Sequence, residues 1–517
     1  MQTRNIVCSL MLILCCSTYS WDQQERQKEL SLEECIFHAI KNNLDVAVQM
    51  HNPELADISV SKAREKFMPS LNFSFNRRDT NSTSSWWIEA AERITTSYSN
   101  YAVQISQLIP TGGQFSVSLN TDRNDSNQSF QNINPRYGST LYLSFSQPLL
   151  KDFGFKTSRK EILVAQNNME ISENDLKKVL LDTVYYVEEA YWNLVYSIET
   201  LKVKQQSLKL AQDLLEKNQK EVEIGTLAPK EILSAQAEVA AREADILQAK
   251  ALVKDYSDLL KTLINHSDEE TIAEIIPLDK PAFEKKERSL EEALDLAIRN
   301  RPDILSSRID LKNKDIDLGY ARNQLLPALN LNANYWSPGI SGDRILYLND
   351  NPFTGVIVGT IPGGASDALK DALNFKYRNW SVYLTLDIPL NTIFSRASVA
   401  QAKVSLDQAM VRLKNLEQKA FLEIKTAVRA VHTDYQRVEA YRIARELAEQ
   451  KLEAEEAKLK VGLSTNFIVL QYQRDLSNAR SAELKAVIDY NLSLSKLDKA
   501  VGINLQSWNI KLSDVWR

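Results

Sequence analysis

The sequence predicts an α+β membrane protein in which long coiled-coil α-helices are joined to antiparallel strands of a β-barrel. Three observations lead to this fold class. Two stretches of about 66 residues have a helical apolar period, six shorter segments alternate apolar with small polar residues, and an internal repeat carries both kinds of segment. The chain is therefore expected to consist of two tandem helix–strand–helix repeats.

The two long helical stretches run from Arg159 to Gly225 and from Arg396 to Gly462, and neither contains proline. A rise of 1.5 Å per residue would make each about 100 Å long. Their apolar positions are separated by steps of three or four residues, the spacing of helices that wind around other helices. These positions are Leu176, Leu180, Val187, Ala190, Leu194, Ile198 and Leu201 in the first stretch, with the polar Thr183 between them, and Ile424, Val428, Val431, Tyr435 and Val438 in the second.

Residues 1–20 have the pattern of an export signal, with Arg4 before the apolar stretch Ile6–Cys16 and the small residue Ser20 at its end. Two alternatives are open. One is an uncleaved membrane anchor, for which the apolar stretch is short. The other is lipidation of Cys15 or Cys16, although the residue before each of these cysteines is not small. Past this signal the chain has a single cysteine, so a mature chain would form no internal disulfide.

The internal repeat begins with a helix start that occurs twice. Ser31 and Glu34 have the spacing of a capping box, and Ser289 and Glu292 repeat it with an offset of 258 residues. The same offset continues without a gap to Pro69 and Pro327. We therefore expect a first repeat at residues 21–264, a linker at 265–288, a second repeat at 289–501 and a short C-terminal tail at 502–517.

Six segments after these two prolines alternate apolar with small polar residues, which predicts strands with one apolar face. They are centred on Leu71–Phe75, Tyr101–Ile105, Phe115–Leu119, Leu141–Phe145, Leu329–Tyr335 and Trp380–Ile388, within the ranges 70–148 and 328–388. Long polar loops are expected at 80–97, 122–138 and 337–378, and a tight turn at 110–113.

Such strands fit a soluble sheet with one wet face, or a barrel with lipid outside and water inside. The export signal and the long helices favour the barrel. No later stretch has 18 consecutive apolar residues, so strands, not helices, would enter a membrane.

Helices complete each repeat. One is expected before the strands, near Leu32–Phe67 in the first repeat. The long helices should span about 155–225 and 392–462, and return helices of about 35 residues should span 229–264 and 466–501. A return helix would be roughly 50 Å long, so the helix before the strands and the return helix, stacked end to end, would match one long helix.

Composition and motifs argue against catalysis and against nucleic-acid binding. The formal net charge of −5 does not indicate the basic surface that binds nucleic acid. The four histidines are not spaced as a metal pair, and the sequence contains no glycine-rich phosphate loop. We therefore expect no enzyme, no cofactor and no metal site.

Four phrases together resemble the TolC family of outer-membrane efflux proteins, over nearly the whole mature chain. The first is Leu32-Glu33-Glu34 with Ala39 and Asn42-Asn43. The others are Pro69-Ser70-Leu71 with Pro327-Ala328-Leu329, Ser146-Gln147-Pro148-Leu149, and Gly225 or Val461-Gly462 with Leu233-Ser234-Ala235-Gln236. The resemblance implies a homotrimer with one shared β-barrel in outer-membrane lipid and a helical tunnel in the periplasm of a Gram-negative-type cell. It implies a passive export duct for efflux or type I secretion that docks to a periplasmic adaptor and an inner-membrane transporter.

The resemblance also implies that the tunnel closes, and that adaptors dock, at the tips of the helical hairpins. The residues expected there are Gly225, Pro229, Glu231, Leu459, Gly462, Ile468 and Gln471. This chain departs from the family pattern at three of them. Ile468 and Gln471 stand where acidic residues ring the constriction, and Leu459 stands where the family has a gating tyrosine. Glu231 either forms a pore-facing ring of three carboxylates or is a first-turn glutamate that complements the helix dipole.

Two questions stay open at the level of sequence. A periplasmic adaptor or structural coiled-coil protein is the alternative function, although adaptors have one helical hairpin and this chain has two. The number of strands is the second question. The segments at 98–108 and 114–121 form an extra hairpin relative to the family, so a trimer would have 18 strands if this hairpin joins the wall and 12 if it does not. Their clean alternation favours 18.

Overall fold

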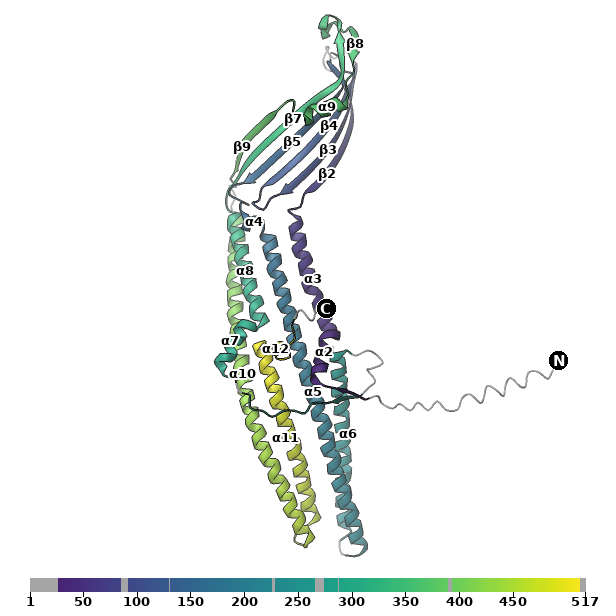
Figure 1. Ribbon diagram of the computed structural model, residues 1–517, viewed down its shortest axis with the longest axis vertical. Helices are drawn as coiled ribbons and strands as arrows, with labels where there is room; N and C mark the ends of the chain where they lie inside the picture. Colours follow the sequence, from purple (N-terminus) through teal and green to yellow (C-terminus); the bar gives the residue numbers. More distant parts are fainter. Residues whose placement is uncertain are drawn as a thin grey trace, which may run out of the picture. The chain divides into compact units, whose positions relative to one another are not determined.

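The computed structural model describes residues 27–84, 92–129, 131–225, 228–265, 274–286, 288–388 and 393–511 (Figure 1). The expected export signal, with Cys15 and Cys16, lies outside these residues. The described chain has a mixed α/β fold that is rich in helix. It divides into two compact units: unit 1 comprises residues up to Asn52, Asn174–Leu305 and Leu416 onward, and unit 2 comprises Pro53–Glu173 and Ser306–Asn415.

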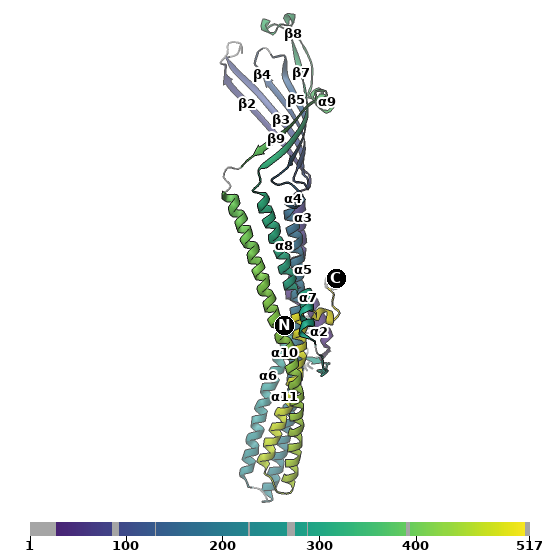
Figure 2. The same cartoon turned by 90° about the vertical axis from the view of Figure 1, so that its left-hand side faces the viewer.

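Unit 2 contains one antiparallel sheet, in which each of the six alternating segments lies in a strand. The strands follow the order β2 (Ser70–Thr83), β3 (Arg93–Leu108), β4 (Gln114–Ser126), β5 (Ile133–Pro148), β7 (Ala328–Tyr347) and β9 (Asn379–Asp387). A short strand, β8 (Ile357–Ile361), pairs with the last residues of β7. In Figure 2 the long strands lie side by side as one continuous sheet.

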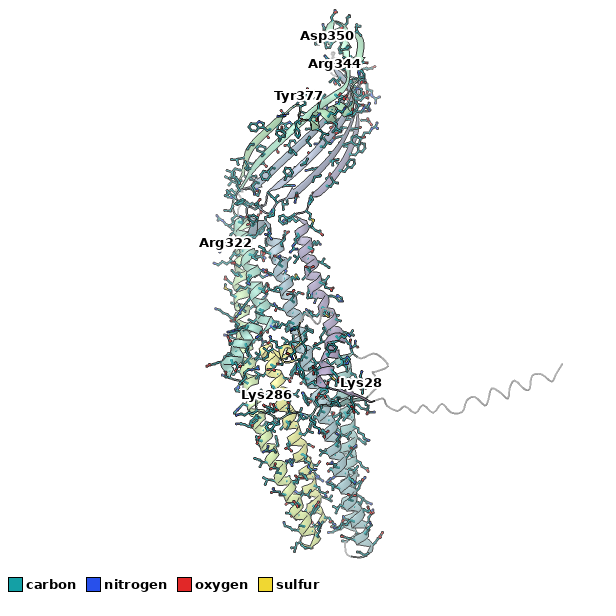
Figure 3. All side chains as sticks on the ribbon, viewed as in Figure 1. Lys28, Lys286, Arg322, Arg344, Asp350 and Tyr377 are labelled. Atoms are coloured by element: carbon teal, nitrogen blue, oxygen red, sulfur yellow. The ribbon has the colours of Figure 1, made fainter. Side chains whose placement is uncertain are left out.

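The strands extend further than the sequence predicted. β2 and β3 pair as far as Thr83 and Arg93, and β5 and β7 pair from Pro148 with Asn330 to Ile133 with Arg344. Half of the expected loop at 80–97 and most of the expected loop at 122–138 are therefore strand, and β7 extends into the loop expected at 337–378. Polar residues there keep the antiparallel hydrogen-bond pattern, which apolar alternation could not reveal. In Figure 3, Arg344 and Asp350 lie at the far end of the sheet from Arg322, which precedes β7.

The pairing register gives the sheet two different faces. One face carries apolar side chains that stay exposed in the single chain, among them Phe73, Ile105, Phe115, Val382 and Leu384. The other face carries serine, asparagine and threonine. Two pairs on that face bond across the strands: the Asn332 amide donates to the Thr385 hydroxyl at 3.2 Å, and the Asn334 amide donates to the Ser381 hydroxyl at 3.3 Å.

A short helix, α9 (Ala365–Leu373), lies against β5 and β7 and was not predicted from the sequence. Its small residues Ala368 and Ala372 are fully buried there. The strand opposite has Gly339, where an added Cβ atom would lie 2.0 Å from the Ala368 carbonyl oxygen. The contact is therefore possible only because these positions are small, a packing requirement that the expected loop at 337–378 did not suggest.

Unit 2 also contains the short helix α4 (Phe155–Ser158) and segments of four long helices: α3 (Leu44–Glu65), α5 (Lys160–Glu223), α8 (Pro302–Asn323) and α10 (Ile393–Lys460). A buried amide joins α5 to α8 there. Asn313 accepts a hydrogen bond from Asn167 at 2.7 Å and donates one to Asn168 at 3.0 Å. None of the helices within the described residues has a stretch apolar and long enough to cross a membrane.

Unit 1 contains the remaining helices: α2 (Leu32–Asn42), α6 (Lys230–Ile264), α7 (Leu290–Asn300), α11 (Asn466–Val501) and α12 (Asn504–Ser507). The single helix expected near Leu32–Phe67 is wrong, because α2 and α3 are separate. Asn43 between them has an extended backbone, and its side-chain oxygen accepts hydrogen bonds from the N–H groups of Asp45 and Val46. The residue therefore ends one helix and caps the next.

The linker, expected to be irregular, contains a strand. β6 (Glu274–Pro277) pairs in parallel with β1 (Gln27–Leu30), which precedes the first repeated helix start. Asp279 follows β6, and its carboxylate accepts hydrogen bonds from the Leu32 N–H at 2.7 Å and from the Tyr191 hydroxyl at 2.8 Å. The linker thereby ties the start of α2 to the middle of α5.

The predicted helical seams form the core of unit 1. Leu176, Leu180, Val187 and Leu194 of α5 are fully buried in one cluster with α2 and α6. Ile424, Val431 and Val438 of α10 are buried in a second cluster with α7 and α11. The expected capping boxes are present in part: Ser31 and Glu34 make both bonds, whereas at α7 only the Ser289 side chain accepts from the Glu292 N–H.

A buried carboxyl group connects α5 to the C-terminal segment of unit 1. The Trp508 indole donates to Glu188 at 2.6 Å, and Glu188 is 4% exposed. Burial raises the pKa of Glu188 to about 7, although the hydrogen bonds from Trp508 and Ser495 act in the opposite direction. Because the unfolded chain releases this proton at lower pH, the contribution of Glu188 to stability is lost as the pH rises from about 4.5 to about 7.

Glu188→Gln is therefore expected to raise the free energy of unfolding at pH 8, by at most about 3 kcal/mol, and to change it little at pH 4. The glutamine keeps an acceptor for Trp508 and removes the buried charge. Thermal unfolding of the purified protein at the two pH values measures the effect, with Glu189→Gln as the neighbouring control. An equal change at both pH values would contradict the assigned role of burial.

Candidate functional site

The first helical tip, in unit 1, consists of the turn between α5 and α6. Gly225 has a left-handed backbone (φ +76°), and its N–H donates to the Val222 carbonyl at 3.0 Å, which ends α5. Glycine adopts this conformation without steric cost. After Thr226 and Leu227, which lie outside the described residues, Pro229 precedes α6 as its N-cap. Glu231 is half-buried in the first turn of α6, where a carboxylate complements the helix dipole.

The second tip, also in unit 1, is the turn between α10 and α11. Gly462 is left-handed as well (φ +77°), and its N–H donates to the Leu459 carbonyl at 3.1 Å. Glu455 braces this turn by accepting hydrogen bonds from the Ser464 hydroxyl at 2.6 Å and from Lys458 at 2.9 Å. These bonds hold the pKa of Glu455 below its usual value, so the brace stays charged at neutral pH.

The three residues that depart from the family pattern have different surroundings. Leu459 is half-buried and packs against the apolar cluster of Leu452, Val469 and Leu476. Ile468 is half-buried, and Gln471 is exposed in the second turn of α11. This tip therefore presents an amide and an apolar side chain where the family pattern has two carboxylates.

Sequence reasoning missed a charged bracket that joins the two hairpins of unit 1, here defined as Ser207, Glu238, Arg242, Leu470 and Arg474. Arg242 of α6 is 5% exposed and donates to the Ser207 carbonyl of α5 at 2.7 Å and to the Ser207 hydroxyl. Its other nitrogens donate to the Glu238 carboxylate at 3.0 Å and to the Leu470 carbonyl of α11 at 3.5 Å. Arg474 of α11 donates to the same Glu238 carboxylate.

The charges within this bracket stabilise one another. Burial raises the pKa of Glu238, but the hydrogen bonds from Arg474 and Arg242 outweigh it and leave the pKa below its usual value. Its contribution to stability is therefore present at neutral pH and is lost as the pH falls through the acid range. An arginine at a buried helical position was the available sequence signal, but only the fold could identify its partners.

A second polar bridge joins the same hairpins nearer the tips. The Asn466 amide of α11 donates to the Asn218 side-chain oxygen of α5 at 2.7 Å, and both residues are buried. A buried amide pair costs free energy when either partner is removed, because the other is left unsatisfied. The bracket and this bridge are thus the polar contacts that hold the two hairpins together at their ends.

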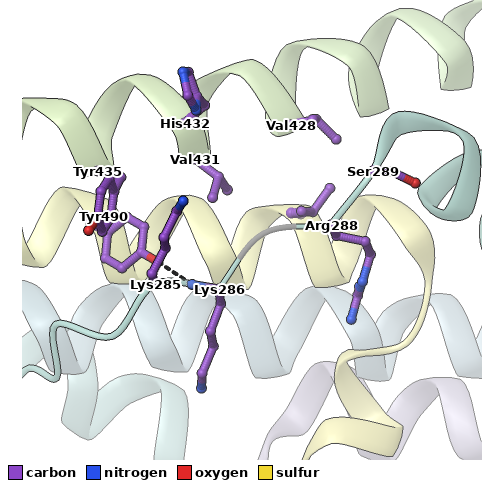
Figure 4. A pocket seen from close by; sticks show the side chains of 10 residues that line it. Lys285, Lys286, Arg288, Ser289, Val428, Val431, His432, Tyr435 and Tyr490 are labelled. Atoms are coloured by element: carbon purple, nitrogen blue, oxygen red, sulfur yellow. Dashed lines mark hydrogen bonds between the residues drawn. The ribbon is translucent and has the colours of Figure 1, made fainter.

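Farther from the tips, the linker borders a pocket of about 420 Å³ in unit 1 (Figure 4). Val428, Val431 and Tyr435 of α10 line it, and in the figure Lys285 points toward this helix. The Tyr490 hydroxyl accepts from the Lys286 N–H at 3.0 Å and donates to the Glu284 carbonyl at 2.7 Å. These bonds fasten the linker to α11, so the pocket wall is a structural part of unit 1.

Nothing in the described residues is arranged as a metal centre, since no group of three histidine, cysteine, aspartate or glutamate side chains converges there. The one cysteine they contain, Cys35, is fully buried, and burial raises the pKa of its thiol to about 12. The side chains described near the tips offer charge and hydrogen bonds between helices.

Comparison with known proteins identifies relatives of this architecture. A family model described as outer membrane efflux protein matches residues 89–266 and 293–503. Nodulation protein T of Rhizobium leguminosarum bv. trifolii is 24% identical over 70% of this chain and 71% of its own length. Outer membrane protein TolC of Vibrio cholerae is 21% identical over 70% of this chain and 76% of its own length.

Solved structures share the fold at low sequence identity. A membrane protein from Pseudomonas aeruginosa superposes with a TM-score of 0.65 at 18% identity, covering 91% of this chain and 93% of its own. The CmeC outer membrane channel of Campylobacter jejuni gives a TM-score of 0.62 at 18% identity and covers 96% of this chain and 95% of its own. The match thus extends over both the sheet and the helices.

Proposed function

Because the chain belongs to the outer membrane efflux protein family, we propose that three copies of it form a passive export duct, with a shared β-barrel in the outer membrane and a helical tunnel in the periplasm. The duct docks at its helical tips to a periplasmic adaptor and an inner-membrane transporter, which supplies the energy. The chain itself acts as a conduit and catalyses no reaction.

The observation that carries this proposal is the sheet of unit 2. One of its faces carries apolar side chains that are exposed on β2, β3, β4 and β9 and half-buried on β5 and β7, and lipid covers such a face in an outer-membrane barrel. A monomeric soluble protein rarely exposes so large an apolar patch. The opposite face of serine and asparagine suits a water-filled lumen.

Sharing of the barrel among chains is supported by the two edges of the sheet. Within the described residues, β2 pairs only with β3, and β9 pairs only with β7. Open edges of this kind invite pairing with another chain. β2 begins at the end of the sheet where β9 finishes, so β2 of one chain can pair antiparallel with β9 of the next.

The helices supply a further reason for association. α10 exposes several apolar side chains along its length, among them Val404, Val411, Phe421, Leu422 and Ile443. A neighbouring chain that covered them would stabilise the assembly by about 25 cal/mol for each Å² of apolar surface removed from water. In the proposed homotrimer, neighbouring chains would cover the sheet edges and these side chains.

The two repeats predicted from sequence fit this assembly. Helices α2 and α7 have 11 residues each, α3 and α8 have 22 each, and α6 and α11 have 35 and 36. Two similar halves in each of three chains would give six similar positions around a tunnel. This pseudo-symmetry supports a closed ring of helices.

Cell fractionation followed by an unheated denaturing gel tests the proposed function. We expect the protein in the outer membrane, as a trimer that dissociates on heating. The alternative function, a periplasmic adaptor or structural coiled-coil protein, predicts recovery as a soluble species. Such recovery would overturn the duct.

Glu231 provides a test of the proposed aperture. Three copies around the axis would form a ring of carboxylates at the first tip, and such rings attract cations. Glu231→Gln is expected to reduce cation preference and block by divalent ions in a planar bilayer. Because Ile468 and Gln471 carry no charge, Gln471→Ala should change neither property. Unchanged selectivity and block in Glu231→Gln would make Glu231 a first-turn carboxylate without a role in the aperture.

A further inference from the structure

The structure bears directly on the extra hairpin, β3 and β4, which the family pattern does not require. We propose that this hairpin belongs to the barrel wall, so that three chains close a barrel of 18 strands whose lumen admits hydrophilic cargo of polypeptide size. The inference rests on the proposed function and adds to it the class of cargo.

Continuous pairing is the first support. β3 pairs with β2 from Ser70 opposite Ser106 to Thr83 opposite Arg93 without a shift. β4 pairs with β5 from Gln114 opposite Ser146 to Asn124 opposite Arg136, also without a shift. The hairpin therefore stands between β2 and β5 over their length and separates two strands that would otherwise be neighbours.

The two faces of the hairpin match those of its neighbours. Val103 lies opposite Phe73 on one side and Leu119 on the other, so the apolar face is unbroken. Asn120 and Gln104 continue the polar face between Asn72 of β2 and Thr140 of β5. A hairpin that projected into water would have no physical reason to keep this register.

Exposure of the apolar face points the same way. Tyr101 and Ile105 of β3 are each 49% exposed, and Phe115 of β4 is 44% exposed. The described residues provide no other polypeptide layer over them. In the barrel, lipid would cover the apolar face of the neighbouring strands. Because the hairpin continues that face, lipid would cover the hairpin as well.

The number of strands determines the width of the pore. Strands about 4.8 Å apart and tilted by about 40° each occupy about 6 Å of the circumference. Three chains of six long strands then give a backbone diameter of about 36 Å, against about 24 Å for 12 strands. Side chains that project from the wall narrow the open bore to roughly 26 Å for 18 strands and roughly 14 Å for 12 strands.

The lining of this lumen suits bulky hydrophilic cargo. It consists mainly of short uncharged side chains, such as Ser116, Ser118, Ser144 and Asn332, with the larger Tyr142, Trp336 and Tyr383 on the same face. Toward the end of the sheet opposite the start of β2, Arg136 is paired with Asp122 at 2.8 Å, so these opposite charges offset each other. A helix with side chains is about 10–12 Å across, and a helical hairpin of about twice that width fits the wider lumen only.

Cysteine labelling tests where the hairpin lies. In the assembled full-length trimer, a membrane-impermeant maleimide should label Gln104→Cys and Ser106→Cys at least tenfold faster than Val103→Cys and Ile105→Cys. Ser144→Cys and Leu143→Cys of β5 serve as the matched pair for a wall strand. Cys35 can be kept, because it is buried. Equal labelling of both faces of β3, with alternation preserved in β5, would overturn the inference.

Removal of residues 93–126 tests the width, because β2 would then pair directly with β5. Polymers of graded size added to the extracellular side should enter the intact barrel up to about 26 Å and the shortened one up to about 14 Å. An unchanged limit in an intact trimer would overturn the inference, and the labelling decides it if the shortened chain does not assemble. Failure of the full-length chain to form a trimer would instead overturn the proposed function.

Discussion

Leu384→Arg should greatly reduce the amount of trimer assembled in the outer membrane. Leu384 lies in the middle of β9 on the apolar face and is 62% exposed in the single chain. An arginine at the midplane of the bilayer costs about 2–4 kcal/mol, and each of the three chains would carry one. Trimer recovered from outer membranes and resolved on an unheated gel measures the loss.

The neighbouring position provides the matched control. Thr385 faces the polar side of the same strand, where it accepts a hydrogen bond from Asn332. Thr385→Arg would place the charge in water, so trimer recovery should stay close to that of the unaltered chain. Equal loss from both substitutions would mean that the two faces of the sheet are wrongly assigned.

Glu238→Ala should open the helical tips. It removes the carboxylate that pairs with the buried Arg242 and with Arg474, and it leaves the guanidinium of Arg242 without its ionic partner. Breaking a buried ion pair in this way costs about 3–5 kcal/mol. In the proposed duct, weakening of this bracket would separate the two hairpins, so conductance in a planar bilayer should rise.

A surface pair on the same hairpin controls for loss of charge alone. Glu216 accepts from Lys220 one turn away at 2.7 Å, and both side chains are exposed. Glu216→Ala should leave conductance unchanged, because exposed ion pairs contribute little. Glu238→Gln keeps one hydrogen-bonding oxygen and should give an intermediate effect. A conductance that is unaltered in Glu238→Ala would exclude the bracket from control of the aperture.

The same bracket predicts a response to acid. The pKa of Glu238 is held below its usual value, so the carboxylate stays charged until the solution is acidic. Glu188 has the opposite response, because burial raises its pKa. Protonation of Glu238 in acid should therefore weaken the contact between the hairpins. Protonation of Glu188 should remove the buried charge beside Trp508.

The sequence alone determined the elements whose signals are local. Helical period and the absence of proline located α5 and α10 to within a few residues, because a long helix repeats its pattern many times. Strict alternation located all six long strands for the same reason. The positive-φ glycines at 225 and 462 and the capping residues Ser31 and Ser289 also follow from local backbone preferences.

Tertiary structure alone decided what depends on partners distant in the sequence. The strands continue beyond their apolar residues because antiparallel neighbours supply hydrogen bonds to polar segments such as Arg123 and Tyr137. α9 forms against Gly339, and β6 pairs with β1, through contacts that no local pattern encodes. The bracket is the clearest case: Arg242, Glu238 and Arg474 are ordinary helical residues, and only the packing of two hairpins brings their charges together. Local periodicity specifies which face of a helix or strand is buried. The attraction between two buried charges, in contrast, arises only when folding brings their side chains together.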